Sequence, residues 1–146
     1  MSASISITTA AGPTTTPAPT TTSRRALWLP GLGFATGGAV AATVVAGAAD
    51  ALGVSLEIAG ARIPLLGFTQ LAFVFSVVGI VLAAAFRRWS DRPAQVFVRT
   101  AVALVAVSLV PDALTPDVDV ATRVALMVTH IAVAAAVVPG LRSRLR

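Results

Sequence analysis

The sequence contains no cysteine, no lysine and a single histidine, and these absences exclude several kinds of chemistry. Without cysteine there is no disulfide, no thiolate nucleophile and no sulfur-ligated metal. One histidine without cysteine cannot assemble an ordinary zinc site. The chain also lacks a glycine-rich phosphate loop after a strand, and no serine has a base at a motif spacing. We therefore expect no enzyme and no cofactor.

Charged residues are scarce as well, at 12% of the chain, whereas hydrophobic residues make up 56% and the mean hydropathy is +0.88. This balance lies outside the range of soluble globular domains. A net charge of +5 would suggest nucleic acid in a soluble protein, but these cations lie at the ends of apolar stretches, where they meet anionic headgroups. We predict the lipid bilayer as the main partner and no binding of nucleic acid.

Four apolar stretches separated by short loops fill most of the chain. They cover residues 26–49, 65–86, 93–110 and 120–141, and each is close to the roughly 20 residues that a helix needs to cross about 30 Å of hydrocarbon. The predicted fold is an all-α membrane protein, with four transmembrane helices in an up-down bundle that forms one domain over residues 24–146.

The loops carry local signals of their own. Val54, Leu56 and Ile58 alternate with polar residues before an Ala59-Gly60 turn, which predicts a short β-hairpin in the first outer loop. An isolated hairpin is marginal in water, so we expect it to pack on the bundle or the headgroups. The loop over residues 111–119, with two prolines and three aspartates, is expected to be a turn that ends in an N-cap, Asp117 or Asp119.

Orientation follows from the arginines. Nine of the 11 lie on one side of the predicted membrane, and Arg62 and Arg123 lie on the other. Because positive residues mark the cytoplasmic side, both termini are expected to be cytoplasmic, in a bacterial inner membrane.

Residues 1–23 differ from the rest, because they are rich in Thr, Pro and Ala and carry no charge over residues 8–22. We expect a disordered cytoplasmic tail. The first span ends in Ala46-Gly47-Ala48, which has the form of a signal-peptide cleavage site, but its apolar run is about twice the usual length. We therefore predict an uncleaved span.

Small residues on the first helix indicate close helix packing. Gly33 and Gly37 are four residues apart, and Gly38, Ala42 and Ala46 continue a ridge on a neighbouring face. We predict that this ridge faces another helix of the same chain. A dimer interface between two copies is the alternative.

His130 is the one ionisable side chain deep in a predicted span, about ten residues or 15 Å from the start of the fourth helix. It shares one helical stripe with Asp119 and Arg123, an arrangement that predicts the outer half of a proton path. The other reading is a neutral histidine that hydrogen-bonds Gln70, Ser76, Ser108 or a backbone carbonyl and locks the bundle. Because no acid lies deep in a span, we favour the structural reading.

The closing run from His130 to Pro139-Gly140-Leu141, followed by arginines, completes a plan that resembles a bacterial family of small four-helix integral membrane proteins catalogued only as a domain of unknown function. The resemblance covers about residues 24–146. It implies four uncleaved spans and no known activity. It also favours a role for His130, without distinguishing a packing role from a proton-handling one. We therefore expect a structural or partner-binding membrane subunit, with an unknown protein partner or self-association, and as alternative a small transporter or proton-linked permease that uses His130 as its titrating group.

Overall fold

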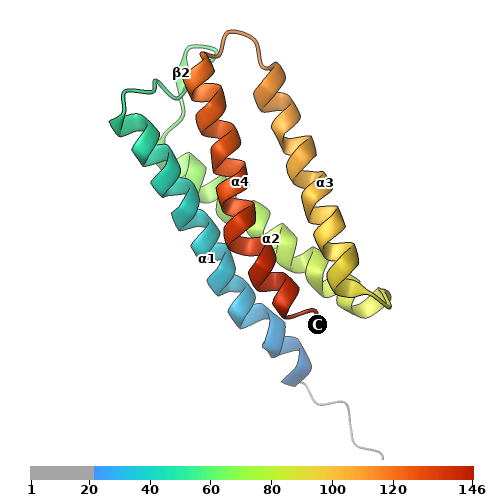
Figure 1. Ribbon diagram of the computed structural model, residues 1–146. Coiled ribbons are helices and arrows are strands. Elements are labelled where there is room, and N and C mark those ends of the chain that lie inside the picture. The colour runs from blue at the N-terminus through green and yellow to red at the C-terminus, as the bar shows by residue number, and fades with distance from the viewer. Residues whose placement is uncertain (1–21) are drawn as a thin grey trace, which may run out of the picture.

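The computed structural model describes residues 22–146, which form four long helices and a small hairpin. In chain order these are α1 (Thr22–Ala51), β1 (Glu57–Ile58), β2 (Ala61–Arg62), α2 (Leu65–Trp89), α3 (Pro93–Leu114) and α4 (Val120–Ser143). Successive helices run in opposite directions (Figure 1). We call the end with residues 52–64 and 115–119 the hairpin end, and the end with residues 87–92 and 142–146 the arginine end.

The predicted fold class is confirmed, because each of the four helices is long and apolar enough to cross a membrane. The helices extend beyond several of the predicted span ends, and one of these differences affects the candidate site. The third helix does not stop at Val110 but continues through Pro111 to Leu114, so Asp112 belongs to a helix and not to a loop. The expected disordered tail falls outside the described residues, except for Thr22 and Ser23, which belong to α1.

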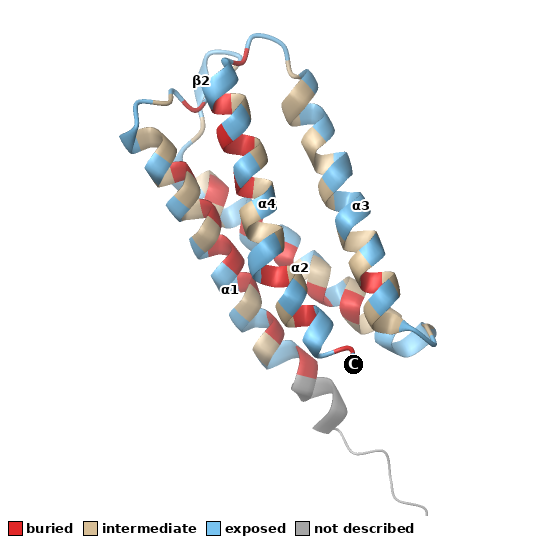
Figure 2. Ribbon diagram, viewed as in Figure 1, coloured by how far each residue is buried: buried red, intermediate tan, exposed pale blue. Residues whose placement is uncertain are grey.

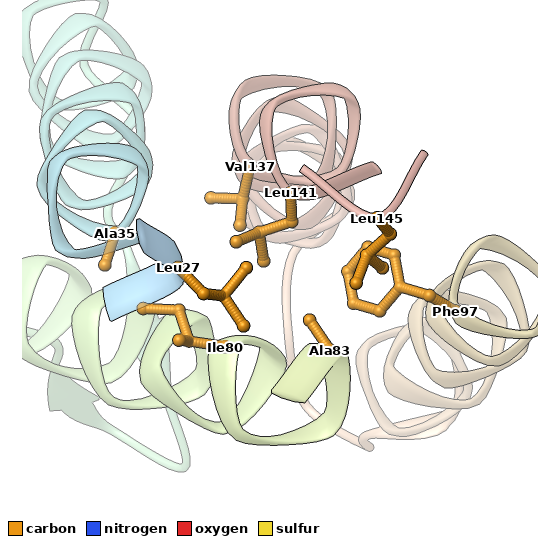
Figure 3. Packing of buried hydrophobic residues seen from close by; sticks show 8 residues of the cluster. All are labelled: Leu27, Ala35, Ile80, Ala83, Phe97, Val137, Leu141 and Leu145. Carbon is orange, nitrogen blue, oxygen red and sulfur yellow. The ribbon is translucent and has the colours of Figure 1, made fainter. Parts of the chain in front are cut away.

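The core has two apolar clusters, one toward each end of the bundle. The cluster at the arginine end joins all four helices (Figure 3), through Leu27, Ala35, Ile80, Ala83, Phe97, Val137, Leu141 and Leu145. The cluster at the hairpin end joins α1, α2, α4 and the first loop, through Ala42, Ala46, Leu56, Phe68, Ala72, Ala125 and Leu126. No buried residue of α3 contributes to this second cluster.

Helix α3 is therefore the most loosely held of the four. Its one buried residue, Phe97, lies near the arginine end, whereas α2 has five buried residues and α4 has six. Most of α3 is exposed or half-buried along its length (Figure 2). The side chains of Val102 and Val107, for example, are exposed.

The predicted hairpin is present and packs on the bundle. Ala59 and Gly60 form its two-residue turn, both with positive φ, as the turn that matches strand twist requires. The segment before it is fixed to α4, because the backbone N–H of the buried Leu56 donates to Oγ1 of Thr122 at 3.2 Å. Thr122 is itself fully buried, so this contact joins the first loop to the start of α4.

The small-residue ridge of α1 packs differently from the prediction. A Cβ placed on Gly38 would lie 2.7 Å from Cγ2 of Val137 and 3.0 Å from Oγ of Ser76, so α1 crosses α4 and α2 closely at this glycine. Ala42 is also fully buried. Gly33 and Gly37 have no atom of another element within 4 Å of such a Cβ. The prediction that these two face another helix of the chain is wrong, because Gly38 and Ala42 occupy the inward face.

Candidate functional site

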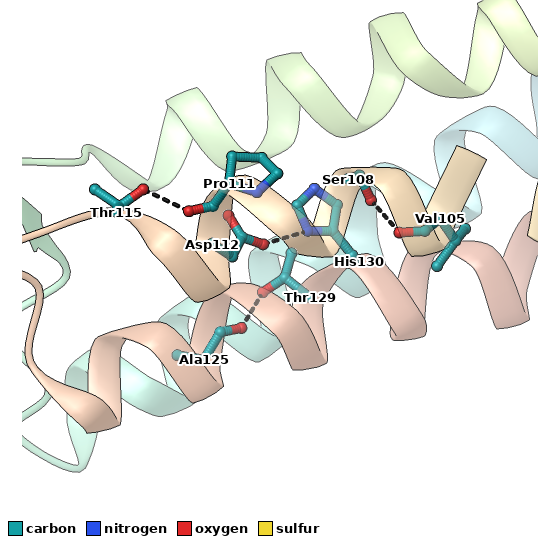
Figure 4. Close-up of polar contacts among 8 residues, drawn as sticks. All are labelled: Val105, Ser108, Pro111, Asp112, Thr115, Ala125, Thr129 and His130. Atoms are coloured by element: carbon teal, nitrogen blue, oxygen red, sulfur yellow. Dashed lines mark hydrogen bonds and ion pairs between the residues drawn. The ribbon is translucent and has the colours of Figure 1, made fainter. Parts of the chain in front are cut away.

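A histidine and an aspartate meet between α3 and α4. Nδ1 of His130 lies 2.8 Å from Oδ2 of Asp112 (Figure 4). The Asp112 side chain is largely buried, with 14% of its surface exposed, whereas the His130 side chain is 39% exposed. The pair is thus only partly covered by the helices of its own chain.

The direction of helical side chains explains how the two residues reach one another. Asp112 lies two residues from the end of α3, whereas His130 lies ten residues into α4. Long side chains on a helix lean toward its N-terminus. Because α3 and α4 are antiparallel, Asp112 leans away from the hairpin end and His130 leans toward it, so their polar atoms converge (Figure 4).

The end of α3 is stabilised although it contains a proline. Pro111 cannot donate a backbone hydrogen bond, but its carbonyl accepts both the backbone N–H of Thr115 at 2.8 Å and the Thr115 hydroxyl at 2.6 Å. These two bonds close the last turn around Asp112. The carboxylate is thereby held on a helix within reach of α4.

Arg123 lies on the α3 side of α4 but does not connect the predicted proton path. Its guanidinium donates to the carbonyl of Thr115 at 3.0 Å, and its buried Nε has no hydrogen-bond partner. Asp119 instead accepts from the backbone N–H of Thr122 at 2.9 Å and from the Ser55 hydroxyl at 3.0 Å. The expected line from Asp119 through Arg123 to the imidazole is therefore not formed by hydrogen bonds.

Asp119 is the N-cap of α4, which confirms one of the two predicted caps. Hydrogen bonds to Thr122, and then to Ser55 and Ala121, stabilise its charged form and lower the pKa of its carboxyl from 3.8 to about 2. Asp119 thus stays charged and serves to join the hairpin loop to α4.

None of the side chains predicted as partners of His130 forms a hydrogen bond with it. Ser76 and Ser108 donate to carbonyls of their own helices, Ala72 and Val105, each at 2.7 Å. This local bonding is common for hydroxyls in helices and leaves no free proton for the imidazole. Gln70 lies exposed in a groove of about 550 Å³ between α1 and α2, away from the pair.

The sequence does carry a signal for Asp112, although the prediction missed it. Ser108 and Asp112 are four residues apart, so they share one helical stripe if the helix continues. Ending the span at Val110 placed the acid in a loop. Transmembrane helices tolerate proline better than soluble helices do, and that tolerance would have placed Asp112 on α3.

Chemically, the pair can hold a proton between a carboxylate and an imidazole, and it can join two helices. Within residues 22–146, no three His, Cys, Asp or Glu side chains come together in a way that could hold a metal ion. The site is therefore best described as an intramembrane ion pair or hydrogen bond, depending on the charge of the histidine.

Comparison with known proteins adds a family but no activity. No curated protein and no solved structure is significantly similar to the chain. One family profile matches residues 22–146, which include all four helices and the Asp112–His130 pair. The chain therefore belongs to the family described as a family of unknown function, DUF6069.

Proposed function

We propose that this protein is a structural or partner-binding subunit of a bacterial cytoplasmic membrane, with both termini in the cytoplasm and no catalytic activity. In this orientation the hairpin end faces outward and the arginine end faces inward, as the positive-inside rule favours. The partner is a second membrane protein, or another copy of this chain, that contacts the side of α3 and α4 on which Asp112 and His130 lie.

The partial exposure of His130 carries this proposal. Ionisable residues within membrane spans almost always face a protein interior or a water-filled cavity, because hydrocarbon cannot satisfy their polar atoms. The His130 side chain is 39% exposed in the chain on its own. A surface that belongs to another protein would complete its cover, and the loosely held α3 borders this opening.

A second candidate is a small proton-linked permease, in which water and not protein covers the pair. The contact between His130 and Asp112 favours it, because a proton relay needs an acid or second base beside the titrating group, and Asp112 supplies one. The two candidates therefore differ in what lies against the same two side chains.

Site-directed crosslinking distinguishes the two candidates. A photo-reactive amino acid at Leu104, which is exposed on α3, is compared with the same group at Val44, which is exposed on α1. We expect one discrete protein adduct at Leu104 in intact membranes and none at Val44. An adduct of twice 14.7 kDa would identify a second copy. Lipid adducts alone at both positions would contradict a partner on α3.

Thiol labelling tests the permease. The chain has no cysteine, so Ser108→Cys, four residues from Asp112 on α3, gives a single reactive group. Reaction with a membrane-impermeant maleimide in intact cells, together with proton uptake by reconstituted vesicles that His130→Asn abolishes, would establish the permease. We expect Ser108→Cys to stay unreactive.

Fusion reporters test the orientation. Reporters placed after Arg88 and after Arg146 should lie in the cytoplasm, and reporters inserted near Gly60 and Thr115 should lie outside. A reporter pair on the wrong sides would reverse the assignment of the two ends.

A further inference from the structure

The contact between α3 and α4 is apolar along most of its length and polar near the hairpin end. A shallow groove of about 330 Å³ lies between the two helices and is lined by small or branched apolar side chains, among them Ala101, Val105, Ala134 and Val138. Further toward the hairpin end, the Asp112–His130 contact joins the helices. Apolar contacts in lipid give little attraction beyond van der Waals packing, so this polar contact contributes much of what holds the end of α3 in place.

Few charged groups face the pair. Helix α3 supplies Asp112, and α4 supplies His130 and, seven residues earlier, Arg123. The α3–α4 connection supplies the Thr115 carbonyl that Arg123 contacts. Residues 27–49 of α1 and 65–86 of α2 contain no titratable side chain. A change in the charge of His130 is therefore balanced by Asp112, with Arg123 opposing the positive form.

The strength of the contact depends on one proton. With neutral His130, Nδ1 can donate one hydrogen bond to the ionised Asp112 carboxylate. When a proton binds the imidazole, both partners carry a charge, and the contact becomes an ion pair that gains the attraction between the two opposite charges. Histidine is the side chain that changes charge between about pH 5 and pH 8.

We propose that Asp112 and His130 form a proton-binding site that acts as a latch, closing the hairpin end of α3 onto α4 when the imidazole is protonated and loosening it when the imidazole is neutral. The latch lies in the part of α3 that contributes no buried residue to the core. Its release would therefore move α3 relative to the other three helices and leave their packing intact.

Distance measurements between spin labels test the latch in the full chain in lipid nanodiscs. One label pair joins α3 to α2 through Val107→Cys and Val74→Cys, and both of these positions are exposed. A reference pair joins α4 to α2 through Val124→Cys and Val74→Cys. In parallel, nitrogen NMR of the single histidine reports directly when the imidazole is protonated.

The expected result is a distribution of α3–α2 distances that narrows as the pH is lowered, in step with the protonation of the imidazole that NMR reports, while the distances of the reference pair stay constant. His130→Gln and Asp112→Asn should both lose this pH response. Asp50→Asn, which removes the ion pair between Asp50 at the end of α1 and Arg62 of β2, should keep the pH response.

Three results would overturn the latch. The first is an α3–α2 distance distribution that does not change as the pH is lowered, and the second is a pH response that persists in His130→Gln. The third is protonation of the imidazole without any change in the distances, which would leave a proton site without a latch. An altered reference distance would reveal that Asp112→Asn fails to fold. In that case the pH response of His130→Gln alone tests the latch.

Discussion

The close crossing at Gly38 gives a sharp test of the packing, because the neighbouring glycine is a matched control. A methyl group on Gly38 would lie 2.7 Å from Cγ2 of Val137, 3.0 Å from Oγ of Ser76 and 3.3 Å from Cγ1 of Val133. Neither close neighbour can move easily. Valine has one strongly preferred rotamer in a helix, and the Ser76 hydroxyl is bonded to Ala72. Gly38→Ala must therefore push α1 away from α4.

The loss of stability caused by overpacking at Gly38 is measured by comparing Gly38→Ala with Gly37→Ala. Both substitutions gain the same helix propensity, about 0.5–1 kcal/mol, but Gly37 has open space around it. Overpacking a filled site costs about 1–3 kcal/mol, so the free energy of unfolding of Gly38→Ala should lie about 1–3 kcal/mol below that of Gly37→Ala. Reversible unfolding in mixed detergent micelles measures both. Equal stabilities, or a less stable Gly37→Ala, would refute the crossing.

Three further predictions concern other contacts. Thr122→Val leaves the backbone N–H of Leu56 without an acceptor and should lower the free energy of unfolding by about 1–3 kcal/mol. Thr122→Ser keeps the hydroxyl and should lower it less. Equal losses of stability would contradict a role for this hydrogen bond. Because the pKa of Asp119 is lowered from 3.8 to about 2, its contribution to stability is present above pH 3.8 and is lost as the pH falls through about 2. Melting curves of Asp119→Asn should therefore show a weaker acid dependence in that window, and an unchanged profile would count against the cap. A methyl group on Gly140 would lie 2.5 Å from the ring of Phe34, so Gly140→Ala should be destabilising by about 1–3 kcal/mol in the natural chain and far less in a Phe34→Ala background, as a double-mutant cycle would measure.

The parts of the fold that depend on local chemistry could be predicted from the sequence. Length and hydropathy placed the four spans, and the Ala59-Gly60 turn and the Asp119 cap were identified from residue type and spacing. Each of these features is decided by a few neighbouring residues. The same holds for Gly38 and Ala42 as packing residues, since both belong to the predicted ridge.

The candidate site could be predicted only in part, because it depends on contacts between helices. Hydropathy identified His130 but could not give its partner, which depends on how far α3 extends and how α3 and α4 align. Which of the two glycines, Gly33 or Gly38, faces the other helices depends on the rotation of α1 about its own axis. Helix α1 has small apolar residues on several of its faces. These residues do not fix its rotation, because lipid and a neighbouring helix present similar apolar surfaces.

The packing of Phe97 bears on how α3 inserts into the membrane during synthesis. This side chain, the one buried residue of α3, lies in a cluster with Leu141 and Leu145 of the following helix and its end. These partners are synthesised 44 to 48 residues later, or about 2–10 s at roughly 5–20 residues per second. During that interval α3, with a mean hydropathy of 1.8, is held by the membrane and by its contacts with the earlier helices, among them Ala83 of α2, without any support from α4. Polar substitutions on its exposed face should therefore reduce membrane insertion during translation more than they reduce the stability of the finished bundle.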